Sequence, residues 1–294
     1  MSNETAQPLV SVMVLAYRHQ DYIDLALRSI LCQQTDFPVE VLVGEDCSPD
    51  ATRDRIRAID AESPGRLTLH LHERNLGMAG NFLHLLNAAQ GKYVAILEGD
   101  DYWTDPLKLQ RQVDVFEQHP EWAICFHRVQ LVNDRGEVTG AKPAAADFPT
   151  VTGTDDLLRN NFISTPSVMF RNRLFDRFPE PLLKLPMLDW PLHLLNAQRG
   201  QVGFLDQSMA AYRDHAGGQW GGRSLQQRYR GMFDAYDAFE DYFGEQCRAT
   251  IREARKAHLD DLSRELQTLQ QSTSLRVGQR IVRTLRFLTL RGTK

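Results

Sequence analysis

Residues 93–103 read YVAILEGDDYW, and this stretch decides the expected fold. Its first half, Tyr93–Leu97, is an apolar run typical of a strand that is buried on both faces. Three carboxylates follow at once around a glycine: Glu98, Asp100 and Asp101. On a loop they repel one another unless a cation lies among them, and Mg²⁺ and Mn²⁺ prefer such oxygen ligands. A solvated acidic turn is the alternative, and this segment alone does not decide between the two.

Predicted strands and helices alternate around this stretch. Apolar runs predict strands at 9–16, 39–43, 67–71 and 122–132, and helical spacing predicts helices at 21–33, 51–61, 79–89 and 106–118. This order predicts an α/β fold with a mostly parallel, doubly wound sheet and helices on both faces. Ligands bind beyond the carboxyl ends of such strands. Glu45 and Asp46 follow one strand and the acidic cluster follows another, so we expect both on the same rim.

The second half of the chain is less regular. Residues 135–149 are rich in Gly, Ala, Pro and Asp, which predicts an irregular loop. We expect a strand at 162–171, a helix at 188–198, a strand at 202–212 and helical structure after residue 224.

Composition excludes several classes of protein. The formal net charge of −4 argues against nucleic acid as a partner, because phosphate binding needs a basic face. None of the four cysteines forms a CxxC pair, so we expect neither a zinc site nor a disulfide framework. The first eight residues lack a signal-peptide pattern, and no apolar stretch approaches the roughly 20 residues that span a bilayer. We therefore expect a cytoplasmic protein.

Several segments in order resemble the nucleotide-binding half of the family-2 inverting glycosyltransferases. The matching segments are 10–17 (VSVMVLAY), 22–34 (YIDLALRSILCQQ), 40–52 (EVLVGEDCSPDAT), 75–77 (NLG) and 98–103 (EGDDYW). The resemblance covers about the first 130 residues well and the rest more loosely. It implies a GT-A fold, a nucleoside-diphosphate sugar donor, usually a uridine one, and a divalent metal, Mg²⁺ or Mn²⁺.

The resemblance also implies roles for single residues. Ala16, Tyr17 and Asp46 would hold the base and ribose, while Asn75, Gly77 and Asn81 would line the nucleotide pocket. Independently, a rim carboxylate such as Glu45 or Asp46 can accept hydrogen bonds from a base or ribose. The acidic cluster would be the family's DxD motif. Its first position here is Glu98, which we expect to face the donor and which leaves metal ligation to Asp100 and Asp101. Tyr17-Arg18 replaces the usual Tyr-Asn pair.

Two later motifs complete the expected site. Asp189 opens a predicted helix where the family has its catalytic base, a group that takes the proton of the acceptor hydroxyl. Its alternative role is to cap that helix. Residues 212–220 resemble a family segment that closes the donor site, in which Arg213 would neutralise phosphate and His215 would ligate the metal or bind diphosphate.

The C-terminal region has two further patterns. Leucines at 259, 262, 266 and 269 form a short heptad-like seam, which packs on its own domain or forms a homo-oligomer. Residues 275–294 carry six basic and no acidic residues, with apolar residues on one helical face. This composition suits either an ordinary surface helix or a helix lying on the inner face of the membrane.

The sequence therefore predicts a catalytic domain at 1–222 and a helical extension at 223–294. Within the first, 1–130 is the expected nucleotide-sugar half and 131–222 the acceptor half. The predicted function is metal-dependent, inverting transfer of a hexosyl or N-acetylhexosaminyl group to a glycan or lipid-linked glycan during synthesis of a surface polysaccharide. The alternatives are a nucleotidyltransferase, disfavoured because no glycine follows the first strand, and a non-catalytic nucleotide-sugar-binding scaffold.

Overall fold

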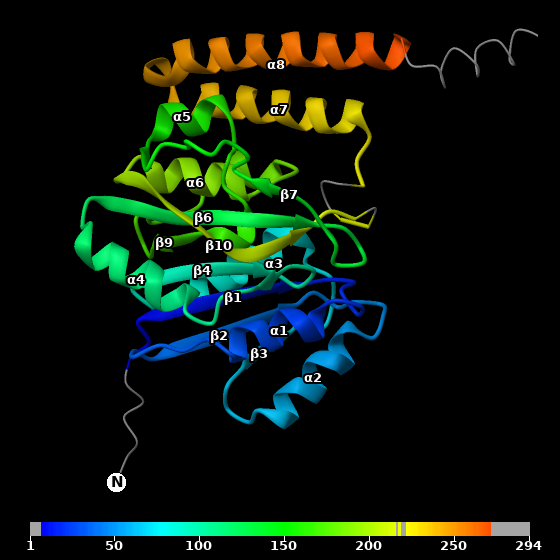
Figure 1. The fold of residues 1–294 in the computed structure, drawn as a ribbon, viewed down its shortest axis with the longest axis vertical. Helices are drawn as coiled ribbons and strands as arrows, with labels where there is room; N and C mark the ends of the chain where they lie inside the picture. Colours follow the sequence, from blue (N-terminus) through cyan, green and yellow to red (C-terminus); the bar gives the residue numbers. More distant parts are fainter. Residues whose placement is uncertain (1–6, 216, 219–221, 272–294) are drawn as a thin grey trace, which may run out of the picture.

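The computed structural model describes residues 7–215, 217–218 and 222–271 (Figure 1). A single large sheet runs through the molecule. Its strands are β1 (Val10–Ala16), β2 (Val39–Glu45), β3 (Thr68–Leu71), β4 (Tyr93–Glu98), β5 (Tyr102–Trp103), β6 (Trp122–Val132), β7 (Val138–Lys142), β8 (Val151–Thr152), β9 (Met169–Arg171) and β10 (Gln201–Arg213). The helices are α1 (Ile23–Leu31), α2 (Thr52–Glu62), α3 (Gly77–Ala88), α4 (Lys108–Gln118), α5 (Thr154–Arg159), α6 (Asp189–Ala197), α7 (Leu225–Phe243) and α8 (Glu245–Gln271).

The strand order is β3-β2-β1-β4-β9-β6-β10-β5. β3, β2, β1 and β4 are parallel to one another, and β6 and β10 are parallel to each other. The short β9 lies antiparallel between β4 and β6 and joins these two parallel blocks. The predicted α/β fold is confirmed, and the carboxyl ends of β1, β2 and β4 meet at one edge.

Both faces of the sheet are covered by helices. In β1, Val12 and Val14 point into a core shared with α1, α2 and α4, while Met13 points into a second core. That second core contains residues of α3, α5, α6, α7 and α8. The uninterrupted apolar run of β1 follows from this burial on both sides.

Two predictions about the second half need correction. Residues 135–149 are not wholly irregular, because β7 pairs with β6 from Val129↔Lys142 to Val132↔Val138. Of the expected strand at 162–171 only β9 is a strand, and Thr165–Ser167 forms a 3₁₀ turn instead. Proline at position 166 supplies no amide hydrogen to a ladder, which favours the turn.

The described part of the chain ends in two antiparallel helices (Figure 1). Ser224 accepts a hydrogen bond from the Gln227 amide at the start of α7, and Gly244, with φ of 71°, separates α7 from α8. Both helices lie beyond α5 and α6, at the top of Figure 1. Leu259 and Leu266 are 47% and 45% exposed, so this part of the seam does not pack on its own domain.

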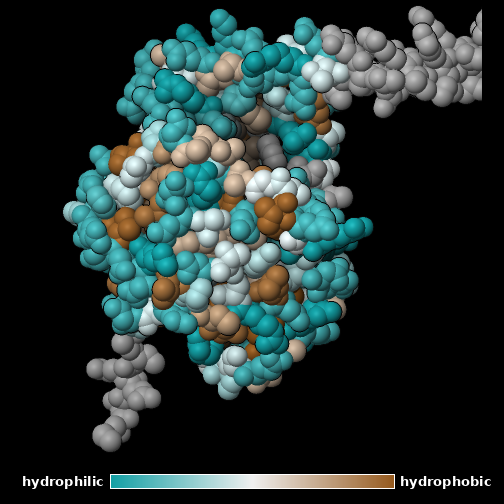
Figure 2. Space-filling view, viewed as in Figure 1, coloured by the Kyte–Doolittle hydropathy of each residue, from teal (hydrophilic) through white to brown (hydrophobic). Residues whose placement is uncertain are grey.

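Surface features bear on the membrane prediction. No helix among residues 7–271 is long and apolar enough to cross a membrane. The face in Figure 2 is mostly hydrophilic, with apolar residues in separate spots. The basic segment 275–294 lies outside the described residues.

Candidate active site

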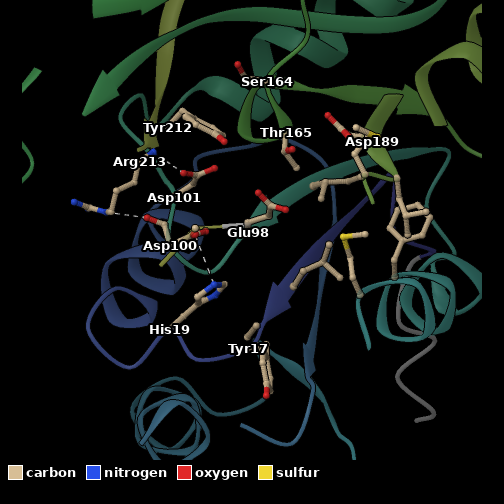
Figure 3. Close-up of a pocket in the computed structure, with 18 of the residues that line it drawn as sticks. Tyr17, His19, Glu98, Asp100, Asp101, Ser164, Thr165, Asp189, Tyr212 and Arg213 are labelled. Carbon is tan, nitrogen blue, oxygen red and sulfur yellow. Dashed lines mark hydrogen bonds and ion pairs between the residues drawn. The ribbon is translucent and has the colours of Figure 1, made fainter. Parts of the chain in front are cut away.

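A cavity of about 1140 Å³ lies at the carboxyl ends of β1, β2 and β4. The ends of β7 and β10 and the start of α6 complete its wall. In Figure 3, Tyr17 lies at one end, the acidic cluster lies in the middle, and Asp189 lies beside Ser164 and Thr165 at the other end. The sequence predicted that Glu45-Asp46 and the acidic cluster lie at the same edge of the sheet, and the structure confirms this.

Glu98, Asp100 and Asp101 converge at the centre of this cavity. Each offers a carboxylate oxygen, and these oxygens all lie within 4.8 Å of one another. Asp101 Oδ1 accepts a hydrogen bond of 2.8 Å from the Arg213 backbone amide. Asp100 Oδ2 accepts one of 3.0 Å from His215 Nε2, and His19 Nε2 lies 3.7 Å from the same oxygen.

The three carboxylates have different proton affinities. Burial, together with Asp100 and Asp189, raises the pKa of Glu98 to about 8. Burial and the other two carboxylates also raise the pKa of Asp101 well above its usual range. Burial acts in the same direction on Asp100, but His19 and His215 outweigh it and lower the pKa of Asp100. The protein groups around the cluster therefore do not neutralise all three carboxylates.

Two oxygens of the cluster have no partner. Asp100 Oδ1 and Asp101 Oδ2 are buried and accept no hydrogen bond from any described residue. Buried acceptors without partners are costly, and a cation bound among them would remove that cost. The donor set consists of oxygens alone, which suits Mg²⁺ or Mn²⁺. The residues present therefore fit the expected metal, and Glu98 belongs to the same cluster.

The segment after β10 borders the cluster, although residues 216 and 219–221 lie outside the described part. Arg213 points its guanidinium at backbone oxygens, with Nε 3.0 Å from the Asp100 carbonyl and Nη1 3.0 Å from that of Asn133. Its predicted phosphate contact stays a prediction. The His215 ring contributes its Nε2 to Asp100, which raises the pKa of His215, so it would have to give up that bond to ligate a metal.

The predicted nucleotide residues lie together at the other end of the cavity. Ala16 and Tyr17 line it, and the Tyr17 ring is 37% exposed. Asp46 is 3% exposed, and its Oδ1 accepts a 2.6 Å hydrogen bond from the Leu76 amide. Asn75 donates from Nδ2 to the Asp46 carbonyl and accepts at Oδ1 from the amide of Gly77, whose φ is 74°. These bonds hold the segments that follow β2 and β3 together.

Two predicted nucleotide residues are placed differently. Glu45 is fully buried, does not line the cavity, and binds the Ser48 amide at 2.6 Å and the Arg53 guanidinium. Asn81 lines the cavity, but its amide group is already bonded to the Gly44 carbonyl and to His72. The geometry therefore assigns Glu45 to the support of the loop after β2, and donor contact by Asn81 stays a prediction.

Packing of the neighbouring side chains requires a glycine at position 99. A Cβ atom at this position would lie 2.6 Å from His19 Nδ1 and 2.9 Å from Ile23 Cδ1. The missing side chain thus makes room for His19 to reach Asp100, and the space above Gly99 is filled by protein.

Asp189 is the first residue of α6 and does not cap it. Leu188 is the N-cap residue, and no side-chain capping bond is present. Instead Asp189 Oδ2 accepts a 2.7 Å hydrogen bond from Asn161 Nδ2. The carboxylate lines the cavity and is only partly buried, so a substrate hydroxyl can reach it. The capping alternative is thereby excluded.

Comparison with known sequences identifies the family. Residues 11–180, more than half of the chain, match the profile of glycosyl transferase family 2.

The chain belongs to glycosyl transferase family 2.

Relatives within this family are recognisable along most of the chain. An uncharacterised protein of Mycobacterium tuberculosis is 39% identical over 217 residues, which are 72% of this chain and 60% of that protein. The putative teichuronic acid biosynthesis glycosyltransferase TuaG of Bacillus subtilis is 32% identical over 70% of this chain and 79% of its own.

The fold of this family member also has solved counterparts. The structure of S. aureus TarS residues 1–349 in complex with UDP-GlcNAc aligns with a TM-score of 0.65 and 20% identity, covering 91% of this chain and 77% of that one. At this level of identity the likeness concerns the fold alone, and it supports the GT-A architecture.

Three residues that line the cavity were not identified from the sequence. His19 lies two residues after Tyr17, where a positive φ of 61° at Arg18 turns the chain back toward the acidic cluster. Asn161 precedes Asp189 by 28 residues, and no local pattern connects them. Lys142 lies in segment 135–149, for which the sequence predicts an irregular loop. The adjacent pair Asn160-Asn161 before an apolar run is the one signal that could have indicated a polar site there.

Proposed function

We propose that this glycosyltransferase transfers a hexosyl or N-acetylhexosaminyl group, with inversion and with a bound divalent metal. The donor is a nucleoside-diphosphate sugar, a UDP-sugar in the first instance, and the acceptor is a hydroxyl of a glycan or lipid-linked glycan. The names of two similar proteins support this, since TuaG is assigned to teichuronic acid biosynthesis and TarS binds UDP-GlcNAc. Synthesis of a surface polysaccharide fits both.

The observation that carries the proposal is the content of one cavity. It holds an oxygen-rich cluster with two unpartnered buried oxygens and, at the opposite end from Tyr17, a separate carboxylate on a helix start. The first suits a cation that accompanies a diphosphate, and the second suits a base. A sugar–diphosphate bond placed between them would have its leaving group and its nucleophile on opposite sides, as inversion requires.

The protein contributes to the reaction through identifiable groups. Asp100 and Asp101, with Glu98 beside them, would hold the cation, which neutralises charge on the leaving diphosphate. Asp189 accepts the proton of the acceptor hydroxyl while that oxygen forms its bond to the anomeric carbon. The bond from this carbon to the diphosphate breaks, and the nucleoside diphosphate leaves with the electron pair. Asn161 keeps Asp189 directed toward the cavity.

The same geometry supports donor-binding roles for the residues at the Tyr17 end of the cavity. The exposed ring of Tyr17 offers a face on which the base can stack, and Ala16 leaves room beside it. Asp46 would accept hydrogen bonds from the base or ribose, with Asn75 and Gly77 holding its loop. The division into a donor half (1–130), an acceptor half (131–222) and a helical extension (223–294) is part of the proposal, as is a location at the inner face of the membrane.

Two variants test the function. Asp189→Asn abolishes sugar transfer while the Kd for UDP-GlcNAc with Mn²⁺, measured by calorimetry, stays within about twofold. Asp101→Asn weakens the Mn²⁺-dependent part of that binding. The control is Asp176→Asn, which removes an exposed carboxylate outside the cavity. Wild-type turnover in Asp189→Asn would refute the role of the base, and UDP-sugar binding without transfer to any acceptor would favour the scaffold alternative.

A further inference from the structure

Lys142 is a cation inside the cavity that has no partner. It is the last residue of β7, lines the cavity and is partly buried. Its ammonium makes no hydrogen bond or ion pair with any residue that the structure describes. An ammonium removed from water without a partner is costly, and the burial lowers the pKa of Lys142.

The ammonium belongs to the end of the cavity that contains Asp189. β7 pairs with β6, and α6, which begins at Asp189, packs on the same strand. The charge of Asp189 accordingly acts on the pKa of Lys142. Asp189 is nevertheless too far away for an ion pair within 4.0 Å, and its Oδ2 is held by Asn161. Lys142 therefore lines the same cavity as Asp189, beside which the acceptor hydroxyl must lie.

Other groups around Lys142 do not neutralise it. The buried His193 ring is held neutral because burial lowers its pKa to about 4, and Lys142 acts in the same direction. The cations elsewhere in the cavity are used differently: Arg213 binds backbone oxygens, and Arg18 lies over the Tyr17 ring at 5.7 Å. The Lys142 ammonium is therefore a positive charge near Asp189 that no described residue neutralises.

We propose that Lys142 binds an anionic group of the acceptor, a phosphate or a carboxylate, so that the enzyme selects acidic acceptors. This inference rests on the proposed function and adds the acceptor's chemical class to it. A lysine acts toward such a group as a flexible point charge rather than as a two-pronged clamp. A phosphate would come from a diphosphate-linked glycan and a carboxylate from a uronic acid residue, and the two sources are separable by experiment.

The experiment compares three acceptors with the full chain, Mn²⁺ and a UDP-sugar that it turns over. The acceptors are an undecyl glycoside of N-acetylglucosamine, the corresponding undecyl diphosphate glycoside, and the undecyl glycoside of a disaccharide ending in glucuronic acid. We expect Lys142→Met to raise KM for one acidic acceptor about 10- to 100-fold, the range for one charge-assisted hydrogen bond. KM for the neutral acceptor and for the donor should stay unchanged, and Lys142→Arg should retain most of the preference.

Controls separate this inference from the proposed function. Lys184→Met removes an exposed lysine outside the cavity and should leave all three KM values unchanged. Calorimetric titration of Asp189→Asn with each acceptor gives the same comparison as Kd, without turnover. Equal use of neutral and acidic acceptors by the wild type, or equal losses in Lys142→Met, would overturn the anion site alone. Failure of the wild type to transfer sugar to any acceptor would overturn the proposed function and the inference with it.

Discussion

Replacement of Asn161 by alanine tests whether this side chain holds the base in position. Asn161 is fixed at both ends of its amide group, because Nδ2 donates to Asp189 Oδ2 at 2.7 Å and Oδ1 accepts from the buried His193 Nδ1 at 3.3 Å. The Asp189 carboxylate accepts no other hydrogen bond from a described side chain. Alanine leaves that carboxylate free to rotate away from the acceptor.

The magnitude follows from the bond that is lost. A hydrogen bond to a charged group contributes about 1.5–3 kcal/mol. Since about 1.4 kcal/mol corresponds to a tenfold rate, Asn161→Ala should lower kcat about 10- to 150-fold. Donor KM should stay within twofold, because Tyr17 lies at the other end of the cavity (Figure 3).

Steady-state kinetics with varied donor and acceptor provide the assay. Asn160→Ala is the matched control, because its side chain is exposed and makes no hydrogen bond with a described residue. The reasoning fails if Asn161→Ala keeps the wild-type kcat, or if Asn160→Ala lowers kcat as much as Asn161→Ala does.

Three further predictions concern stability. Glu45→Ala leaves the Arg53 guanidinium without its buried partner and should lower the free energy of unfolding in urea by about 3 kcal/mol, with the donor Kd nearly unchanged; a large change in donor Kd without destabilisation would restore Glu45 to the donor site. Gly99→Ala forces His19 aside and should cost about 1–3 kcal/mol, part of which His19→Ala regains in the double variant; no cost would contradict the packing argument. Burial lowers the pKa of Lys108 to about 7 from 10.5, so the unfolded chain binds more protons between these values. Lys108→Met should therefore stabilise the protein most at pH 7 and progressively less up to pH 10, and a gain independent of pH would refute this.

The strands of the donor half were predictable because they are buried on both faces. Such burial demands uninterrupted apolar runs, and those runs mark β1, β2 and β4 in the sequence. β7 was missed because it has the opposite environment. Its residues VTGAK are exposed or partly buried at the side of β6, and a polar strand with a glycine has no periodicity to detect.

The sequence predicted those residues of the site that lie at strand ends or within family motifs. Adjacent residues at a strand end point to opposite faces, so Glu45 and Asp46 could not both face the donor, and the sequence did not indicate which one does. Asn161 and Lys142 come from segments distant in the sequence, and only the packing of β7 and α6 brings them to Asp189. Local patterns contain no information about such contacts.

The hydrogen bond from the Arg213 amide to Asp101 has a consequence for synthesis of the chain on the ribosome. Its two ends are 112 residues apart, and Arg213 is the last residue of β10. A nascent chain that has completed the nucleotide-binding strands still lacks the amide that positions Asp101. N-terminal segments generally fold first during translation. The Asp101 carboxylate therefore gains this hydrogen bond only after the whole of β10 has been synthesised.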